Sequence, residues 1–135
     1  MAYNTINRAD KIAPTGDWVG TTDTQTLTNK TLTGAVLDGA VTQETFPLTN
    51  GTVNPINGTI QSISLDANTA FTISLSDGQS VFLMLASNGY TPSWATSITW
   101  VTSLGNIEPT LSGSDAFLFW AVGSTVYGSY SGSFA

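Results

Sequence analysis

Two stretches of the chain are apolar on both faces, and they limit the folds open to it more than any other feature. Residues 81–86 read V-F-L-M-L-A, and residues 116–122 read A-F-L-F-W-A-V. Side chains alternate between the two faces of a β-strand, so a strand without polar positions needs an apolar cover on each side. The core of a β-sandwich supplies one cover. We expect a neighbouring subunit to supply the other.

The rest of the C-terminal part reads as short strands joined by turns. Apolar and polar side chains alternate over residues 71–75, and Asp77-Gly78 predicts a tight turn that closes a hairpin. Further strands are expected at residues 98–101 and 125–130, with a turn at Gly123-Ser124 before the last one. This spacing predicts a mainly β fold, an antiparallel sandwich or jelly-roll-like module of about six to eight strands.

Two residue types are missing from the chain, and their absence excludes several kinds of chemistry. The sequence has neither Cys nor His. Thiolate zinc sites, thiol nucleophiles and Ser-His pairs are therefore excluded, as is the usual general base at neutral pH. We expect no catalytic residue, no metal and no cofactor. No apolar run resembles a signal peptide or approaches the roughly 20 residues of a membrane span, so we also expect no membrane insertion.

Charge is sparse and unevenly distributed. Charged residues make up 9% of the chain, the net charge is -6, and the three cations are Arg8, Lys11 and Lys30. Nucleic-acid binding and docking to anionic lipid both depend on Lys and Arg, so we expect neither partner. A surface covered mainly by Ser, Thr, Asn and Gly is unusual for a free monomer and suits a component of an assembly.

Residues 21–53 show no lasting helix or strand period, but they contain short repeats. Gly34-Ala35-Val36 recurs as Gly39-Ala40-Val41. Small residues let backbones approach closely, so several identical chains wound about one axis fit this pattern. The apolar side chains facing that axis would be Leu27, Leu32, Val36, Leu37 and Val41. The alternative is a linker in which the repeats arose by chance.

The preceding residues carry a specific resemblance. Residues 24–32 read T-Q-T-L-T-N-K-T-L, which is similar at every position to a segment of many fibre and other virion proteins of tailed bacteriophages. More loosely, Ile98-Thr99-Trp100, Pro109-Thr110-Leu111 and Val126-Tyr127-Gly128 resemble a small β module that ends many phage fibres. This chain departs from that module with Val101 in place of a common Pro and Val126 in place of an aromatic residue, and it lacks a second Trp in the connecting loop.

The resemblance implies a homotrimeric, non-enzymatic virion protein, a short fibre on the tail or the head. Residues 1–22 would form an arm that anchors the chain to other virion proteins through Ile12, Trp18 and Val19. Residues 23–56 would form an intertwined trimeric neck, and residues 57–135 a β-sandwich head. The chain would be made in the host cytoplasm without a signal peptide and would reside in the phage particle. Trp18 has a simpler alternative role, which is to pack onto its own domain.

Three further functions stay open at this point. The head would contact host-surface glycans if aromatic rings are exposed, and Tyr90 and Trp94, in a polar stretch, are the preferred candidates among the Trp and Tyr residues. A capsid decoration protein is the second alternative. A glycan-cleaving tailspike module is the third, and it would use two carboxylates. Its candidates are Asp66, Asp77, Glu108 and Asp115. Most of these lie in turn sequences where Asp serves the backbone, so we expect no enzyme.

Overall fold

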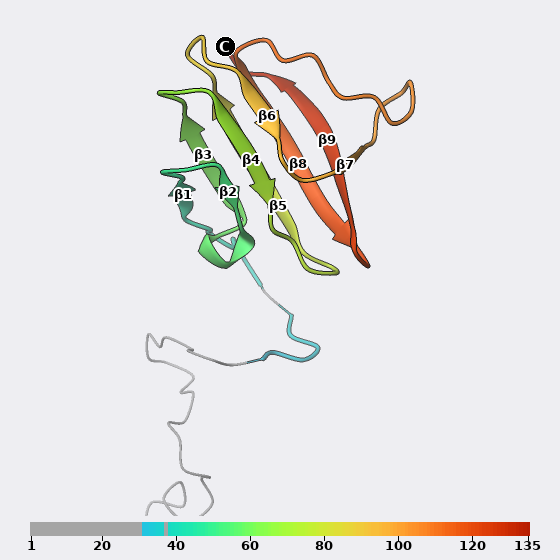
Figure 1. Ribbon diagram of the computed structural model, residues 1–135. Helices are drawn as coiled ribbons and strands as arrows, with labels where there is room; N and C mark the ends of the chain where they lie inside the picture. Colours follow the sequence, from blue (N-terminus) through green and yellow to red (C-terminus); the bar gives the residue numbers. More distant parts are fainter. Residues whose placement is uncertain (1–30, 37) are drawn as a thin grey trace, which may run out of the picture. The chain divides into compact units, whose positions relative to one another are not determined.

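A computed structural model describes residues 31–36 and 38–135 and divides the chain after Gly39. Residues Ala40–Ala135 form one compact unit, called the β unit below. Its regular secondary structure is almost all β-strand, as predicted (Figure 1). Five of the predicted contact residues lie outside the described residues: Ile12, Trp18, Val19, Leu27 and Leu37.

The described residues contain nine strands and one short 3-10 helix. In chain order these are β1 (Thr45–Pro47), β2 (Thr52–Val53), η1 (Pro55–Asn57), β3 (Ile60–Ser64), β4 (Thr69–Ile73), β5 (Ser80–Ala86), β6 (Pro92–Trp94), β7 (Ile98–Trp100), β8 (Ser114–Val122) and β9 (Thr125–Ser133). The 3-10 helix is capped at its N-terminus, where the Asn54 side chain accepts a hydrogen bond from the Ile56 amide at 3.0 Å.

The strands form two sheets that face each other across the core (Figure 1). One sheet has six strands in the order β1-β3-β5-β8-β9-β7, and the other has three in the order β2-β4-β6. From β1 to β6 the chain alternates between the sheets, so each turn of this winding adds one strand to each sheet. Neighbouring strands within β1-β3-β5 and within β2-β4-β6 are consequently parallel.

This winding corrects part of the predicted topology. The turn at Gly123-Ser124 does join an antiparallel pair, β8 and β9, and β5 also pairs with β8 in antiparallel fashion. The turn at Asp77-Gly78 also forms: Gly78 has a φ of 76°, and the Gln79 amide donates to the Ser76 carbonyl at 3.0 Å. However, it carries the chain from β4 in one sheet to β5 in the other, so the predicted hairpin was wrong. A purely antiparallel sandwich was wrong for the same reason.

The β unit begins before the predicted boundary at residue 57. Leu48 and Val53 are buried in its core, although both come from the stretch expected to form the neck. Leu48 directly follows β1 and Val53 belongs to β2, and these strands have only three and two residues. Such short strands leave no readable alternation in the sequence, which is why the pattern did not predict them.

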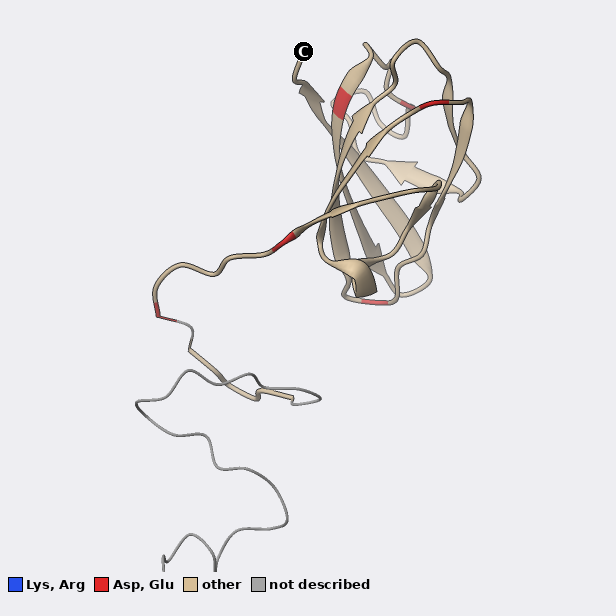
Figure 2. Cartoon of the chain, turned by 90° about the vertical axis from the view of Figure 1, so that its left-hand side faces the viewer, with Lys and Arg blue, Asp and Glu red and all other residues tan. Residues whose placement is uncertain are grey.

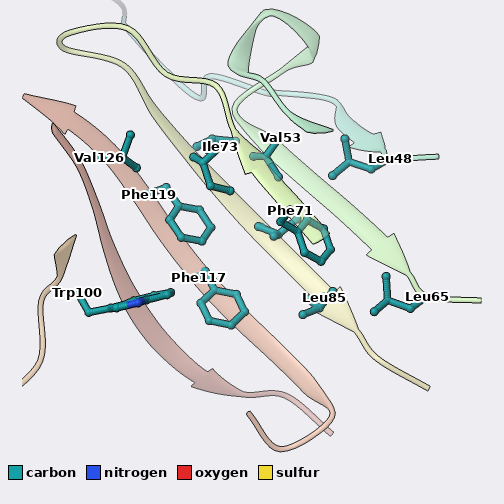
Figure 3. Close-up of a cluster of buried hydrophobic side chains, with 12 residues drawn as sticks. Leu48, Val53, Leu65, Phe71, Ile73, Leu85, Trp100, Phe117, Phe119 and Val126 are labelled. Atoms are coloured by element: carbon teal, nitrogen blue, oxygen red, sulfur yellow. The ribbon is translucent and has the colours of Figure 1, made fainter. Parts of the chain in front are cut away.

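The core lies between the two sheets and is rich in aromatic rings (Figure 3). In β8, Phe117 and Phe119 point inward and are fully buried, which stabilises the fold by about 1.5–3 kcal/mol for each ring. Their planes differ by only 13°, with ring centroids 5.8 Å apart. Phe71 and Ile73 from β4 pack against them from the opposite sheet.

Candidate assembly surfaces

The outward face of the six-stranded sheet carries large apolar side chains. Because Val81, Leu83 and Leu85 point into the core, the alternate residues of β5 face outward. The same alternation in β3, β8 and β9 completes the set, which we call the outer apolar face: Ile60, Phe82, Met84, Leu118, Trp120 and Tyr127. Leu118 is 40% exposed, and the other five are half-buried.

Strand register makes these side chains neighbours. Ile60, Phe82 and Leu118 lie opposite one another on three adjacent strands and form one row across the sheet. Trp120 and Tyr127 are paired across β8 and β9, and their rings stack with centroids 5.7 Å apart and planes 13° apart. The outer apolar face is therefore one continuous patch over the central strands.

An open hollow of about 470 Å³ adjoins this patch. Its lining includes Met84 of the outer apolar face together with Pro47 of β1 and the C-terminal Phe134. Phe134 is 47% exposed. The surface thus combines projecting rings with an apolar recess. Such a shape can pack closely against a complementary apolar surface.

The outward face of the three-stranded sheet has the opposite character. Thr52 lies opposite Thr72, and Ala70 lies opposite Ser93. All four are exposed and small, and three of them carry hydroxyl groups. Water can hydrogen-bond to the hydroxyl groups of such a face, whereas the side chains of the outer apolar face offer it few hydrogen-bonding groups.

Within the β unit, acidic residues are few and lie mostly in loops (Figure 2). After Lys30 the sequence has no cation and six acids: Asp38, Glu44, Asp66, Asp77, Glu108 and Asp115. Only Asp115 belongs to a strand, and its side chain points inward from β8 and is fully buried. Among the described residues, the six-stranded sheet therefore presents no charge on its outward face.

Asp115 is held by hydrogen bonds from its own surroundings. Its carboxylate accepts from the Ser112 amide at 3.1 Å, the Gly113 amide at 3.0 Å, the Ser112 hydroxyl at 2.8 Å and the Tyr130 hydroxyl at 2.9 Å. Burial alone raises the pKa of Asp115, but these donors together outweigh it and hold the pKa below its ordinary value. The carboxylate thus fastens the loop before β8 to β9, and its oxygens are already occupied.

The remaining candidate carboxylates of the cleavage hypothesis belong to separate loops. Asp77 accepts a hydrogen bond from the Gly123 amide at 2.8 Å, so it ties the β4–β5 connection to the β8–β9 turn. Asp66 follows β3, and Glu108 lies between β7 and β8. In the part of the chain that the structure describes, no group of three or more acidic residues is placed to hold a metal ion. Within residues 31–36 and 38–135, no helix has the length and apolar character needed to cross a membrane.

The two candidate glycan contacts differ in their surroundings. Tyr90 is 42% exposed in the connection between β5 and β6. Trp94 is half-buried and packs against the aromatic core, so it is not the freely exposed ring that was expected. Its centroid lies 5.5 Å from Phe71 and 5.1 Å from Phe117, and Trp100 and Phe119 are also neighbours.

The small or polar residues around Trp94 explain why the sequence favoured an exposed ring at this position. Ser93 and Ala95 are exposed on either side of it, so the stretch alternates, but over only three strand residues. Trp94 also has a buried Nε1 atom without a hydrogen-bond partner among the described residues. The stacked rings that do lie on an outward face, Trp120 and Tyr127, were not the candidates that the sequence favoured.

The described apolar residues of the predicted neck lie uncovered. Val36 is 91% exposed, Val41 63% and Leu32 59%. They precede β1 along the chain, in the segment of residues 31–44, where the structure has no strand or helix among the described positions. In a single chain these side chains are exposed, so their burial would have to come from another surface.

Comparisons of the chain with protein-family models, curated protein sequences and solved structures found no match.

Proposed function

We propose that the chain is a non-enzymatic structural protein of a tailed-bacteriophage virion, a short fibre in which three copies associate through the segment before β1. The observation that carries the proposal is the exposure of Leu32, Val36 and Val41 in a single chain. Three parallel copies would bury these side chains against one another around a common axis, as symmetric homo-oligomers do.

Two features of the sequence support the virion assignment. The string at residues 24–32 is similar at every position to a segment of phage virion proteins, and it ends at Leu32, the first of the exposed apolar residues. The Gly-Ala-Val repeats that follow supply the small residues that closely wound chains need. The arm of residues 1–22 would then attach the trimer to the particle through Ile12, Trp18 and Val19.

The oligomeric part of the proposal is tested by the molar mass of the full chain in solution. Light scattering after size exclusion should give three times 14.1 kDa, about 42 kDa. Leu32→Asp combined with Val36→Asp should shift the mass to 14.1 kDa at micromolar concentration, because buried carboxylates oppose association. Thr33→Asp is the matched control: it adds a charge at an exposed polar position of the same segment and should leave the trimer intact.

A wild-type mass of 14.1 kDa would overturn the trimer. A trimer unaffected by the double substitution would show that the segment is only a tether. The location on the particle is tested separately by antibody labelling of purified virions under the electron microscope. Label on fibres of the tail or head supports the proposal, whereas label spread over the shell indicates a capsid decoration protein.

A further inference from the structure

We infer that the outer apolar face of the six-stranded sheet packs against the same sheet of the other copies, so that assembled chains are joined through their β units as well as through the segment before β1. The inference rests on the proposed trimer and identifies a second contact surface for it. The occupant of the face is another copy of this chain.

The contrast between the two outward faces is the first argument. A β-sandwich that is free in water presents polar side chains on both outward faces, because water covers them. The three-stranded sheet does so, with Thr52, Thr72 and Ser93 exposed, whereas the outward serines of the six-stranded sheet, such as Ser62 and Ser129, lie beside large apolar side chains. The six-stranded sheet instead presents Phe82, Leu118 and Trp120, from which a covering surface would exclude water.

Charge indicates that the covering surface is another copy. Every charged residue after Lys30 is acidic, so copies of the β unit repel one another wherever their loops approach. The outer apolar face is the surface on which identical chains meet without opposing carboxylates. A partner protein with a basic patch would find no acidic residue to pair with on this face. The same uncharged apolar face of another copy can pack against it without such a mismatch.

The path of the chain brings this face close to its counterparts. Val41, one of the proposed contact residues, lies four residues before Thr45, the first residue of β1. Four residues span at most about 14 Å, and β1 is the edge strand of the same six-stranded sheet. Chains joined at Val41 therefore hold their sheets at an effective concentration on the order of millimolar, at which even a weak contact forms.

The face alone is somewhat smaller than a standard stable interface, but it is large enough for a contact between chains that are already joined through the segment before β1. Six strands spaced by roughly 4.8 Å, with lengths of up to nine residues, present an area on the order of 600 Å². A standard stable interface buries about 800 Å² on each partner. The hollow lined by Met84 and Phe134 adds apolar area beside the central row.

The first test uses the absence of cysteine from the chain. Two full-length variants receive one thiol each: Ser129→Cys beside Leu118 on the outward face of the six-stranded sheet, and Ser93→Cys on the opposite outward face. The rate at which each thiol reacts with a chromogenic disulfide reagent is measured twice. One measurement uses the trimer, and the other uses chains that also carry Leu32→Asp and Val36→Asp. We expect the thiol at position 129 to react at least about tenfold more slowly in the trimer. The thiol at position 93 should react equally fast in both.

The outcomes separate this inference from the proposed function. A wild-type chain of trimeric mass whose thiol at position 129 is as reactive as in the dissociated background would overturn the sheet contact and leave the proposed function standing. A wild-type monomer would overturn the proposed function and the sheet contact with it.

A second variant makes the test independent of thiol chemistry. Leu118→Asp places a carboxylate in the centre of the outer apolar face, at a position 40% exposed in the single chain, so the fold should persist. Its trimer should dissociate at least about tenfold more readily on dilution. Thr72→Asp on the polar face is the matched control and should dissociate like the wild type. Equal dissociation of both variants, each shown to be folded by circular dichroism, would overturn the inference; if Leu118→Asp does not fold, the thiol at position 129 decides it.

Discussion

At the scale of single residues, Asp115 gives the β unit a specific dependence on pH. The pKa of this buried carboxyl is lowered by donors from Ser112, Gly113 and Tyr130. A group with a lowered folded pKa contributes stability that is complete above its unfolded pKa of about 3.9 and is lost as the pH falls through the folded value. Asp115→Asn should therefore lower the free energy of unfolding by about 1–3 kcal/mol at neutral pH.

The difference between wild type and Asp115→Asn should shrink as the pH falls below about 4. Urea unfolding monitored at neutral pH and at several acid pH values measures it. Asp66→Asn, at an exposed position, serves as the control and should change little at neutral pH. A difference for Asp115→Asn that stays constant down to acid pH would mean that the charged form of Asp115 does not stabilise the fold.

Gly128 tests the packing of the core at the scale of one methyl group. A Cβ atom added there would lie 2.8 Å from Cγ2 of Ile98, 2.9 Å from Cζ3 of Trp100 and 3.1 Å from Cδ1 of Phe119. These contacts are too close, so Gly128→Ala should destabilise the β unit by about 1–3 kcal/mol in urea unfolding. Ser131→Ala, at an exposed position of the same strand, is the control. A gain in stability, the usual effect of Gly→Ala where space allows, would show that the core has room at this position.

At the scale of elements, β6 connects the two sheets through one side chain. Trp94 comes from the three-stranded sheet and contacts Trp100 of β7 as well as Phe117 and Phe119 of β8. Trp94→Ala should lower the free energy of unfolding by about 3–5 kcal/mol. Tyr90→Ala, in the loop just before β6, should cost less than about 0.5 kcal/mol. Chemical denaturation compares the two, and equal losses would contradict this role for Trp94.

The elements also show which parts of the fold the sequence predicts. Alternation located the longer strands, and the doubly apolar residues 81–86 and 116–122 became β5 and β8, the centre of the larger sheet. Asp77-Gly78 specified its turn correctly but not the partner of the next strand, because local turn chemistry is the same whether the chain stays in one sheet or crosses to the other. β1, β2 and β6, which have only two or three residues each, were missed.

The candidate surfaces were predictable to a different degree. The sequence indicated that residues 81–86 and 116–122 need a second cover, but it did not show which other residues share their outward face. Strand register decides that, and it places Ile60 of β3 and Tyr127 of β9 beside them. Trp94 was assigned to the surface because its neighbours are polar, whereas burial depends on the opposite sheet.

At the scale of the whole molecule, the separation of charge from the outer apolar face predicts how the assembly responds to salt. Contacts made by ion pairs weaken as salt screens them, whereas apolar contacts do not. The proposed interfaces use Leu32, Val36, Val41 and the outer apolar face, and all acids after residue 30 repel one another between copies. Raising NaCl from about 0.05 M to about 0.5 M should therefore leave the trimer's dissociation unchanged or make it less extensive.

Sodium sulfate should strengthen the trimer further, because excluded salts favour burial of apolar surface. Analytical ultracentrifugation of the full chain over a dilution series at each salt concentration measures both effects. Thr72→Asp again provides the control. An acid added on the polar face should not change the direction in which salt shifts the trimer's dissociation. A trimer that dissociates about tenfold more readily in high salt would instead assign the association to ion pairs. The only cations available for such pairs are Arg8, Lys11 and Lys30, so the contact would then lie in the first thirty residues rather than on the sheet.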